Sequence, residues 1–569
     1  MYRSFFLVRF ICVRLSVGSL RYLKLYAGII RIVWQQTILF YLIGVDSMAQ
    51  INVSNLTFCY EGSYDDIFES VSFSIDTDWK LGFIGRNGKG KTTFLKLLLG
   101  EYEYQGSITT SVCFDYFPYE IPKSAEEQDT IEVLEYIHPD YELWKVCVEL
   151  NQLQLDAEIL YRPFKTLSFG ERTKVMLALL FSRENYFLLI DEPTNHLDMP
   201  TRELVRDYLN SKKGFLLVSH DRWLLDSCID HVLVLNRTNI TVGKGNFSTW
   251  WENKERQDNY EKRENDKLKQ EIKKLQESAR ISAAWADKVE RSKIGFNPVK
   301  EHDRCLDTRA YMGEKSRRMQ QRRKNLERRQ QKDIEEKSML LKNLEETKEL
   351  KLQPLNHHKE TYIRMKEYGL SYGEHSVVEN FNLELKRGER VILEGSNGCG
   401  KSSILKAVLA SPAVTVLNQR PNDREEFLTT ITMQEHGLKE VASGLIISYI
   451  NQDSSFLTGR LDDYIEQIGL SNSMFKTVLR QMDFDRVQFE KNMEDYSEGQ
   501  KKKVLIAGSL LQQAHLYIWD EPLNYIDVFS RMQIEKLILT YQPTMLMVEH
   551  DRFFCEQVGT SLIKLTDRV

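Results

Sequence analysis

Gly85-Arg86-Asn87-Gly88-Lys89-Gly90-Lys91-Thr92 is the stretch that decides the fold of this 569-residue chain. An apolar run, residues 79–84, precedes it and a helix-like run, residues 93–99, follows it, which predicts strand, loop and helix. The spacing G-x-x-x-x-G-K-T lets a glycine-rich loop turn its backbone N–H groups toward phosphates, with the lysine as counter-charge and the threonine hydroxyl for Mg²⁺. The N-terminus of the helix adds a positive dipole end. The sequence therefore predicts a nucleotide phosphate site.

The same pattern recurs in the second half of the chain. Gly395-Ser396-Asn397-Gly398-Cys399-Gly400-Lys401-Ser402 again follows an apolar run, residues 391–393. Three further pieces recur in order: a Ser-x-Gly sequence that opens a helical pattern, an apolar run that ends in Asp-Glu, and an apolar run that ends in His-Asp-Arg. Ser168 and Glu192 are 24 positions apart, as are Ser497 and Glu521. The chain is therefore predicted to contain an internal duplication of an α/β ATPase domain.

One interval differs between the copies. The phosphate-loop lysine and the later serine are 77 positions apart in the first copy and 96 in the second, so the second copy carries an insertion between them.

Composition bounds the class of protein. The length suggests three or four domains, and a net charge of −5 argues against a general nucleic-acid binder. The eight cysteines form no C-x-x-C pair, which indicates neither a zinc site, a metal cluster nor a disulfide framework. A reducing cytoplasm fits this cysteine usage best.

The first 47 residues are basic and apolar. Residues 32–45 are uncharged but shorter than the roughly 20 residues that a membrane-spanning helix needs. We expect this segment to be an extension outside the fold, with the working chain beginning at Met48; a membrane anchor is the alternative.

The middle segment, residues 246–358, has no counterpart in the repeated unit. Residues 250–288 and 315–350 are charged, helical in pattern and nearly free of Gly and Pro, which predicts two antiparallel helices of about 60 Å each. Near the base, alternating charges are typical of a solvated coiled coil. Between the helices, a turn at residues 295–298 and an excess of Arg and Lys, with Phe296 and Tyr311, suit phosphate contact and base stacking. The predicted domains are residues 1–47, 48–245, 246–358 and 359–569.

These motifs carry a family resemblance. Leu167-Ser168-Phe169-Gly170-Glu171, the D-E-P-T-N-H-L-D run at residues 191–198 and V-S-H-D-R at residues 218–222 resemble the ABC-F proteins, over residues 48–569. The resemblance implies two tandem P-loop ABC ATPase domains joined by a long α-helical hairpin arm. It also implies a monomer with intramolecular pairing, in which each ATP lies between the phosphate loop of one domain and the Ser-Gly loop of the other. ATP and Mg²⁺ are the cofactors implied.

The resemblance assigns roles residue by residue. Glu192 and Glu521 would polarise the attacking water, and His220 and His550 would contact the γ-phosphate side. The metal set comprises Thr92, Asp191, Ser402, Gln452 and Asp520. The ATP-contacting set comprises Tyr60, Gly85, Asn87, Gly88, Gly90, Lys91, Thr92, Thr93, Ser168 and Gly170 in the first copy, and Tyr372, Gly395, Asn397, Gly398, Gly400, Lys401, Ser402, Ser403, Ser497, Gly499 and Gln500 in the second. Tyr60 and Tyr372 would stack on the bases, with ordinary packing as the alternative for Tyr60.

The chain departs from the family pattern at three places. Phe169 stands where the family often has Gly, and Tyr496 and Glu498 replace Leu and Gly in the second copy. Gln452 matches the family's Mg²⁺-side glutamine, but Tyr119 stands at that position in the first copy. The two sites are therefore expected to differ in turnover rate.

Five further stretches, residues 65–68, 76–80, 161–164, 246–248 and 519–525, look most like the antibiotic-resistance branch of the family. That branch protects ribosomes against lincosamides, streptogramin A and pleuromutilins. By resemblance, the arm would enter the tRNA exit site and reach 23S rRNA and P-site tRNA near the peptidyl-transferase centre. The alternatives are a housekeeping translation factor, the ATPase of a transporter and a DNA-maintenance ATPase. No stable membrane partner is expected.

Overall fold

The computed structural model describes residues 50–60, 66–195, 197–236, 239–291, 351–373, 375–417 and 433–565, with a few helical positions between 317 and 332. The segment 1–47, the basic tip and most of the second predicted arm helix lie outside the described residues. Among the residues described, no helix is both long and apolar enough to cross a membrane.

The first domain, which we call cassette 1, contains two sheets. A small antiparallel sheet has the order β2-β1-β4, and a six-stranded sheet has the order β5-β6-β7-β3-β8-β9, in which only β8 and β9 pair antiparallel. The strands are β1 (Gln50–Phe58), β2 (Phe68–Asp76), β3 (Lys80–Gly85), β4 (Gln105–Thr109), β5 (Cys113–Phe117), β6 (Tyr186–Asp191), β7 (Phe215–Val218), β8 (His231–Leu235) and β9 (Ile240–Lys244). The helices are α3 (Lys91–Leu99), α4 (Thr130–Ile137), α5 (Leu143–Gln152), α6 (Phe169–Phe181), α7 (Met199–Ser211) and α8 (Arg222–Cys228), with 3₁₀ turns η1 (Ala157–Tyr161) and η2 (Phe164–Thr166).

The second domain, cassette 2, repeats this arrangement. Its antiparallel sheet has the order β11-β10-β14, and its parallel sheet has the order β13-β15-β16-β17-β12-β18. The strands are β10 (Thr361–Tyr372), β11 (His375–Lys386), β12 (Arg390–Glu394), β13 (Val414–Leu417), β14 (Met433–Val441), β15 (Leu445–Ile450), β16 (Leu516–Asp520), β17 (Met545–Val548) and β18 (Ser561–Lys564). The helices are α11 (Lys401–Leu409), α13 (Leu461–Gln467), α14 (Asn472–Gln481), α15 (Glu498–Leu511), α16 (Val528–Tyr541) and α17 (Arg552–Val558), with 3₁₀ turns η3 (Arg486–Glu490) and η4 (Met493–Asp495).

The apolar runs of the sequence become the central parallel strands. All four residues of β7 and all four of β17 are buried, as expected for strands covered by helices on both faces. The predicted fold, two tandem α/β domains, is confirmed. The strand register also locates the insertion in cassette 2. Phe117 pairs with Ile190 and Ile450 with Trp519, so these two positions correspond, and the extra residues precede Ile450.

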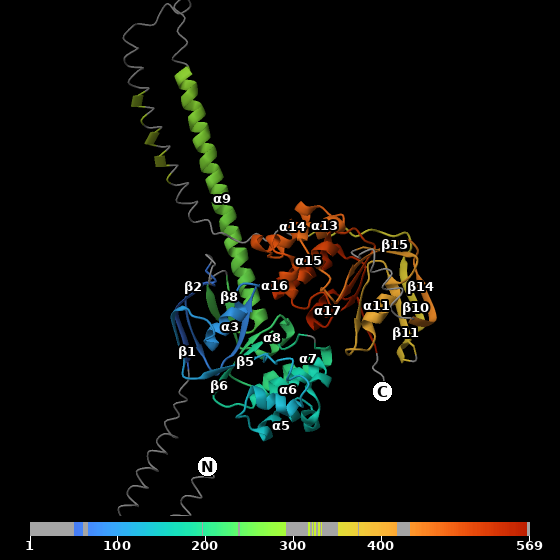
Figure 1. Cartoon of the computed structure of the whole chain (residues 1–569). Helices are drawn as coiled ribbons and strands as arrows, with labels where there is room; N and C mark the ends of the chain where they lie inside the picture. The colour runs from blue at the N-terminus through green and yellow to red at the C-terminus, as the bar shows by residue number, and fades with distance from the viewer. Residues whose placement is uncertain are drawn as a thin grey trace, which may run out of the picture.

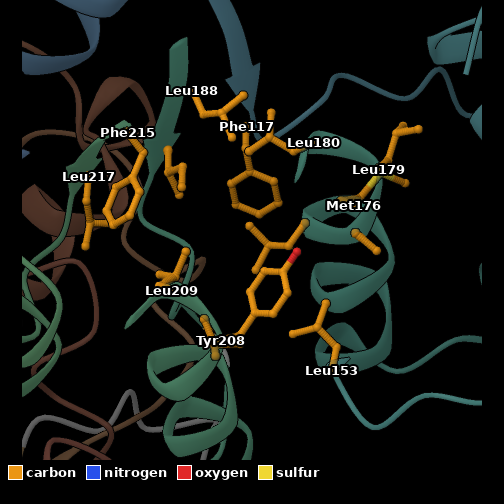
Figure 2. Packing of buried hydrophobic residues seen from close by; sticks show 14 of the residues in the cluster. Phe117, Leu153, Met176, Leu179, Leu180, Leu188, Tyr208, Leu209, Phe215 and Leu217 are labelled. Atoms are coloured by element: carbon orange, nitrogen blue, oxygen red, sulfur yellow. The ribbon is translucent and has the colours of Figure 1, made fainter. Parts of the chain in front are cut away.

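The largest core of cassette 1 packs the parallel sheet against α6 and α7 (Figure 2). Phe117 and Phe215 project from the sheet toward Leu179 and Leu180 of α6 and Tyr208 of α7. Each fully buried Phe or Leu side chain contributes about 1.5–3 kcal/mol relative to an exposed one. This packing fixes α6, and therefore the loop at its N-terminus, relative to the strand ends.

Helix α9 (Phe247–Arg291) leaves cassette 1 directly after β9. It has 45 residues and extends away from both cassettes (Figure 1). At its base, Trp250 and Trp251 pack against Phe529 of α16, with ring centroids 6.4 and 5.8 Å apart. Val528 of α16 belongs to the core of cassette 1. The two cassettes and the base of α9 therefore share one apolar junction.

A reciprocal pair of ionic contacts also joins the cassettes. Arg222 at the start of α8 pairs with Glu535 of α16, and both side chains are buried. Arg552 at the start of α17 pairs with Glu203 of α7 at 2.8 Å, in a more exposed position. The His-Asp-Arg sequences of both copies thus contact the other cassette through their arginines.

A buried ion pair fixes the start of α16. The carboxylate of Asp527 accepts a hydrogen bond from the backbone N–H of Ser530 at 2.9 Å and lies 2.9 Å from the ammonium of Lys503. Burial disfavours the Asp527 carboxylate, but the charge of Lys503 is among the effects that lower its pKa below the usual range. Lys503 also donates to the backbone oxygen of Met482.

We predict that Lys503→Met lowers the free energy of unfolding of cassette 2 by about 3–5 kcal/mol, because it leaves the Asp527 carboxylate buried without its cation. The measurement is urea unfolding of the full chain followed by circular dichroism. The control, Arg364→Met, removes a solvent-exposed pair with Glu384 and should change the free energy of unfolding far less, because water screens that pair. Equal losses in the two variants would contradict the prediction.

Candidate functional site: two composite nucleotide sites

The two phosphate loops, residues 85–92 and 395–402, each connect a buried parallel strand to a helix. Gly90 and Gly400 cap the N-termini of α3 and α11 with φ of 104° and 97°. A Cβ at Gly90 would lie 2.5 Å from Ile67, and one at Gly400 would lie 2.6 Å from Val378. Glycine is required at both positions by backbone conformation and by space. The loops therefore hold the helix N-termini open toward an anion.

The phosphate-loop lysines are buried and directed over their own loops. The ammonium of Lys91 donates to the backbone oxygen of Gly85 at 2.7 Å, and that of Lys401 donates to the oxygens of Gly395 and Ser396, both at 2.7 Å. Burial lowers the pKa of Lys91, while the nearby carboxylates Asp527 and Glu192 oppose that shift. Each loop thus carries a cation at its centre.

The parallel strands β6 and β16 deliver two carboxylates each to the loops. The hydroxyl of Thr92 donates to Asp191 at 2.9 Å, and a hydrogen bond from Ser402 reaches Asp520. Burial raises the pKa of both aspartates, that of Asp520 to about 6. These hydroxyl and carboxylate oxygens fit Mg²⁺, which prefers oxygen ligands.

The glutamates that follow adopt a left-handed backbone conformation, with φ of 51° at Glu192 and 47° at Glu521. Such a conformation costs a non-glycine residue about 1–3 kcal/mol and is concentrated at functional sites. Nε2 of His220 lies 3.4 Å from Glu192, and Nε2 of His550 lies 3.4 Å from Glu521. Burial, followed by the charges of Lys91 and Arg531, lowers the pKa of His220 well below its usual value.

Several buried polar atoms beside the loops have no hydrogen-bond partner among the described residues. They are Oε1 of Glu192, Oδ1 of Asp520 and both ring nitrogens of His550. Unsatisfied buried polar atoms are uncommon, and those in a cleft mark where a ligand, metal ion or water binds. The positions of these unpaired atoms beside the phosphate loops fit a bound nucleoside triphosphate with Mg²⁺.

The tyrosines predicted to stack on the bases occupy different surroundings. Tyr60 is 42 % exposed, its hydroxyl is hydrogen-bonded to Thr93 at 2.7 Å, and its ring packs edge-on against Phe58 and Tyr102. Tyr372 lines the cavity of the second site. The structure therefore places Tyr372 in a site cavity, whereas the described contacts of Tyr60 are with Thr93, Phe58 and Tyr102.

The Ser-Gly loops begin α6 and α15 with capping boxes. Oγ of Ser168 accepts from the N–H of Glu171 at 3.2 Å, and Oγ of Ser497 accepts from the N–H of Gln500 at 3.3 Å. The side-chain oxygen of Gln500 accepts in turn from the N–H of Ser497. Gln500, predicted as an ATP contact, thus serves as a helix cap in this structure.

The first phosphate loop lies against the Ser-Gly loop of cassette 2, and we call this composite site 1. Nδ2 of Asn87 donates to the backbone oxygen of Tyr525 at 2.6 Å. A Cβ at Gly499 would lie 3.1 Å from the same nitrogen. Arg86 pairs with Asp483 at 3.1 Å. Site 1 therefore takes its second wall from the other cassette.

The second phosphate loop forms composite site 2 in the same way. A cavity of about 460 Å³ is lined by Phe169, Leu197 and Arg202 of cassette 1 and by Tyr372, Val377, Asn397, Gly398, Gly400, Lys401, Ser402, Ser403, Gln452, Glu521, Asn524 and His550 of cassette 2. The N–H of Asn397 donates to Asp198 across the interface at 3.4 Å. A cavity of this size suits a ligand of nucleotide dimensions. Both cassettes thus line the cavity, but the cassette 1 residues predicted to contact ATP, Ser168 and Gly170, are not among its lining residues.

The two sites differ beside the glutamates. In site 2, the amide groups of Gln452 and Asn524 donate to the same oxygen of Glu521, at 2.9 and 2.8 Å. The register of β5 and β15 places Tyr119 at the position of Gln452, as the sequence indicated, and the Tyr119 hydroxyl donates to Asp115 instead.

The pKa values of the two glutamates also differ. Burial, reinforced by the charge of Asp191, raises the pKa of Glu192 to about 8. Burial also opposes ionisation of Glu521, but the nearby His550 ring, the hydrogen bond from Gln452 and the charge of Lys401 outweigh it and lower the pKa to about 2. Asn524 was not among the predicted site residues. The signal was available, because Asn195 and Asn524 both stand three positions after the glutamate.

We predict opposite pH effects for the two glutamine variants in nucleotide-free chain with EDTA. The pKa of an unfolded glutamate is about 4.3. Glu192 keeps its proton to about pH 8 when folded, so its contribution to stability falls as the pH rises from about 4.3 to 8. Glu192→Gln removes that loss and should raise the melting temperature by a few degrees at pH 8, with little change at pH 4.5.

Glu521→Gln should do the reverse. The pKa of Glu521 is depressed in the fold, so its stabilisation is present above about pH 4.3 and is lost as the pH falls toward 2. This variant should therefore melt at a lower temperature than the unsubstituted chain at pH 8. Differential scanning fluorimetry across pH 4.5–8 measures both effects, and shifts of the same sign would be inconsistent with the two environments.

We also predict unequal losses of ATPase activity. Glu521 is ionised and oriented by two amides, so Glu521→Gln should reduce steady-state ATP hydrolysis by about 10²-fold or more. Glu192 has no such amide donors among the described residues, and Glu192→Gln should reduce ATP hydrolysis by less than about tenfold. Phosphate release at saturating ATP is the measurement, and equal losses would show that the two sites are equivalent.

Comparisons with known proteins agree with this arrangement. A family model described as "ABC transporter" matches residues 68–195 and 378–524, once in each cassette. The chain is 25 % identical over 516 residues to the ribosome protection protein VmlR of Bacillus subtilis, covering 89 % of this chain and 85 % of that protein. It is 24 % identical to the energy-dependent translational throttle protein EttA of Haemophilus influenzae, covering 88 % and 89 %.

A solved structure has the same fold. The archaeal ribosome recycling factor aABCE1, in complex with the ribosomal stalk protein aP1, aligns with a TM-score of 0.55 and 19 % identity, over 90 % of this chain and 87 % of that one. Two ABC ATPase domains on one chain make it an ATP hydrolase, and its similarity along most of its length to VmlR and EttA agrees with the ABC-F resemblance of its motifs.

Proposed function

We propose that this chain is a cytoplasmic, Mg²⁺-dependent ATPase that binds the ribosome through its helical arm and protects the peptidyl-transferase centre from antibiotics. The observation that carries the proposal is the position of α9. A 45-residue helix starts at the apolar junction between two cassettes that share both of their nucleotide sites. Similarity to the ribosome protection protein VmlR over 89 % of the chain supports the same reading.

The residues of the composite sites account for a nucleotide-dependent clamp. In each site, a phosphate loop holds the triphosphate from one cassette and a helix N-terminus contacts it from the other. Mg²⁺, held by Thr92 and Asp191 or by Ser402 and Asp520, would neutralise phosphate charge. Loss of the γ-phosphate removes the charge that both cassettes contact, so hydrolysis favours separation of the cassettes.

Within each site we assign one task to each side chain. Glu521 accepts a proton from the attacking water, with Gln452 and Asn524 fixing its orientation. Glu192 has the corresponding task in site 1. His220 and His550 contact the γ-phosphate side.

The surface of α9 is compatible with an arm. Leu268, Ile272 and Leu275 are partly shielded from solvent, whereas Lys273 and Lys274 are exposed. The helix therefore carries apolar positions at helical spacing on one face and cations beside them. Contact with 23S rRNA and P-site tRNA near the exit site is proposed for the basic tip predicted from the sequence.

A second candidate function is that of a housekeeping translation factor. The similarity to the translational throttle protein EttA over 88 % of the chain favours it. Such a factor would bind ribosomes with the same cassettes and the same sites. The two candidates differ in whether the chain changes antibiotic susceptibility.

We predict that cells expressing the full chain show raised minimal inhibitory concentrations for a pleuromutilin, a lincosamide or streptogramin A. The variant that combines Glu192→Gln with Glu521→Gln should confer no protection, because it binds ATP but loses about 10²-fold or more of its total ATP hydrolysis. It should instead stay bound to ribosomes after ATP addition, as measured by sedimentation with ribosomes.

A drug from another target class, such as a gyrase inhibitor, is the control and should be unaffected. Unchanged susceptibility to all three ribosomal drugs, with ribosome binding intact, would favour the translation factor. Equal release of the double variant and the unsubstituted chain after ATP addition would contradict the clamp.

A further inference from the structure

Lys502 lies on the helix that serves site 1, but its charged group is directed toward site 2. It is the fifth residue of α15, whose N-terminus at Ser497 and Gly499 faces the first phosphate loop. The Lys502 side chain is 3 % exposed. Its ammonium donates to the backbone oxygens of Asn451 at 3.1 Å and Gln452 at 2.7 Å. A buried cation is therefore used to hold two consecutive carbonyl groups.

These carbonyl groups belong to the segment that orients the predicted base of site 2. The side-chain amide of Gln452 donates to Oε2 of Glu521 at 2.9 Å. Two residues later, the hydroxyl of Ser454 donates to Glu498 at 2.6 Å, which returns the segment to the first residue of α15. The start of α15 is thus joined at two points to the segment that carries Gln452.

The described residues of cassette 1 lack the corresponding connection. Thr173 stands at the position of Lys502 in α6, and Phe169 at that of Glu498. Tyr119 replaces Gln452, and its hydroxyl bonds to Asp115 rather than to Glu192. The path from a Ser-Gly helix to the glutamate of the same cassette is therefore present in cassette 2 alone among the residues described.

We propose that Lys502 is a positioning residue that couples the two ATP sites, so that engagement of α15 by nucleotide in site 1 sets Gln452 and Glu521 for hydrolysis in site 2. The contacts run in sequence: Gly499 beside Asn87 of site 1, Lys502 one turn further along α15, the carbonyl groups of residues 451–452, and then Glu521. The proposal rests on the assignment of Glu521 as the base. Turnover in site 2 therefore depends on site 1 more than the reverse.

The test isolates site 2 in the full chain. In the Glu192→Gln background, Lys502→Met should lower kcat for ATP by about tenfold with KM changed less than about twofold, because a small displacement of a catalytic group slows chemistry more than binding. Lys502→Arg retains the donor and should recover most of the rate. The matched control is Thr173→Met, at the corresponding position of cassette 1, which should leave kcat within about twofold of the background.

Two further measurements separate coupling from damage to the helix. Equilibrium binding of radiolabelled ATP should still show two filled sites in the Lys502→Met chain, because the loops that hold the phosphates are untouched. Ser497→Ala weakens the start of α15 at site 1 and should also slow site 2. Combined with Lys502→Met, it should produce a loss smaller than the product of the two separate losses, since both act on one path.

Each outcome has a distinct meaning. An unchanged kcat in Lys502→Met, a fall matched by Thr173→Met, loss of one bound ATP, or fully multiplicative losses with Ser497→Ala would each overturn the coupling role while leaving the ATPase intact. If Glu192→Gln abolishes hydrolysis and Glu521→Gln does not, the base assignment in site 2 is wrong, and the coupling role is overturned with it. If the unsubstituted chain hydrolyses no ATP, the proposed clamp is refuted, and the coupling role is overturned with it.

Discussion

Each nucleotide site of this protein depends on a wall supplied by the other cassette. The hydrogen bond from Asn87 to the backbone of Tyr525, and that from Asn397 to Asp198, join loops hundreds of residues apart in the sequence. A phosphate loop alone offers N–H groups from one side of an anion, and the partner's helix N-terminus supplies the second side. The apolar junction around Phe529 and the pairing of Arg222 with Glu535 hold those walls in register.

Duplication produced two glutamates in the same backbone conformation but in different electrostatic surroundings. Glu192 and Glu521 end corresponding strands and have nearly the same φ. Burial and the charge of Asp191 raise the pKa of Glu192, whereas the His550 ring, the Gln452 amide and the charge of Lys401 outweigh burial and lower the pKa of Glu521. The protonation state of each glutamate therefore depends on the side chains around it, and the side chains at positions 119 and 452 are among those that differ between the two sites.

Local patterns made most of the fold predictable. Apolar runs before the phosphate loops and before Asp191 and Asp520 became buried parallel strands, because their length and flanking residues are typical of such strands. What the sequence could not give are contacts with no local signature. The direction of the Tyr119 hydroxyl, the capping role of Gln500 and the reach of Lys502 toward residues 451–452 depend on tertiary packing. The predictions for residues 1–47 and for the basic tip lie outside the described residues.

The base of α9 has a mechanical consequence. Trp250 and Trp251 pack against both the core of cassette 1 and Phe529 of cassette 2, so a change in the angle between the cassettes acts on the fixed end of a long rigid rod. A helix of 45 residues is about 67 Å long. A rotation of about 5° at its base displaces the far end by about 6 Å over such a length. A small rotation at this junction would therefore move the backbone at Arg291 by several ångströms.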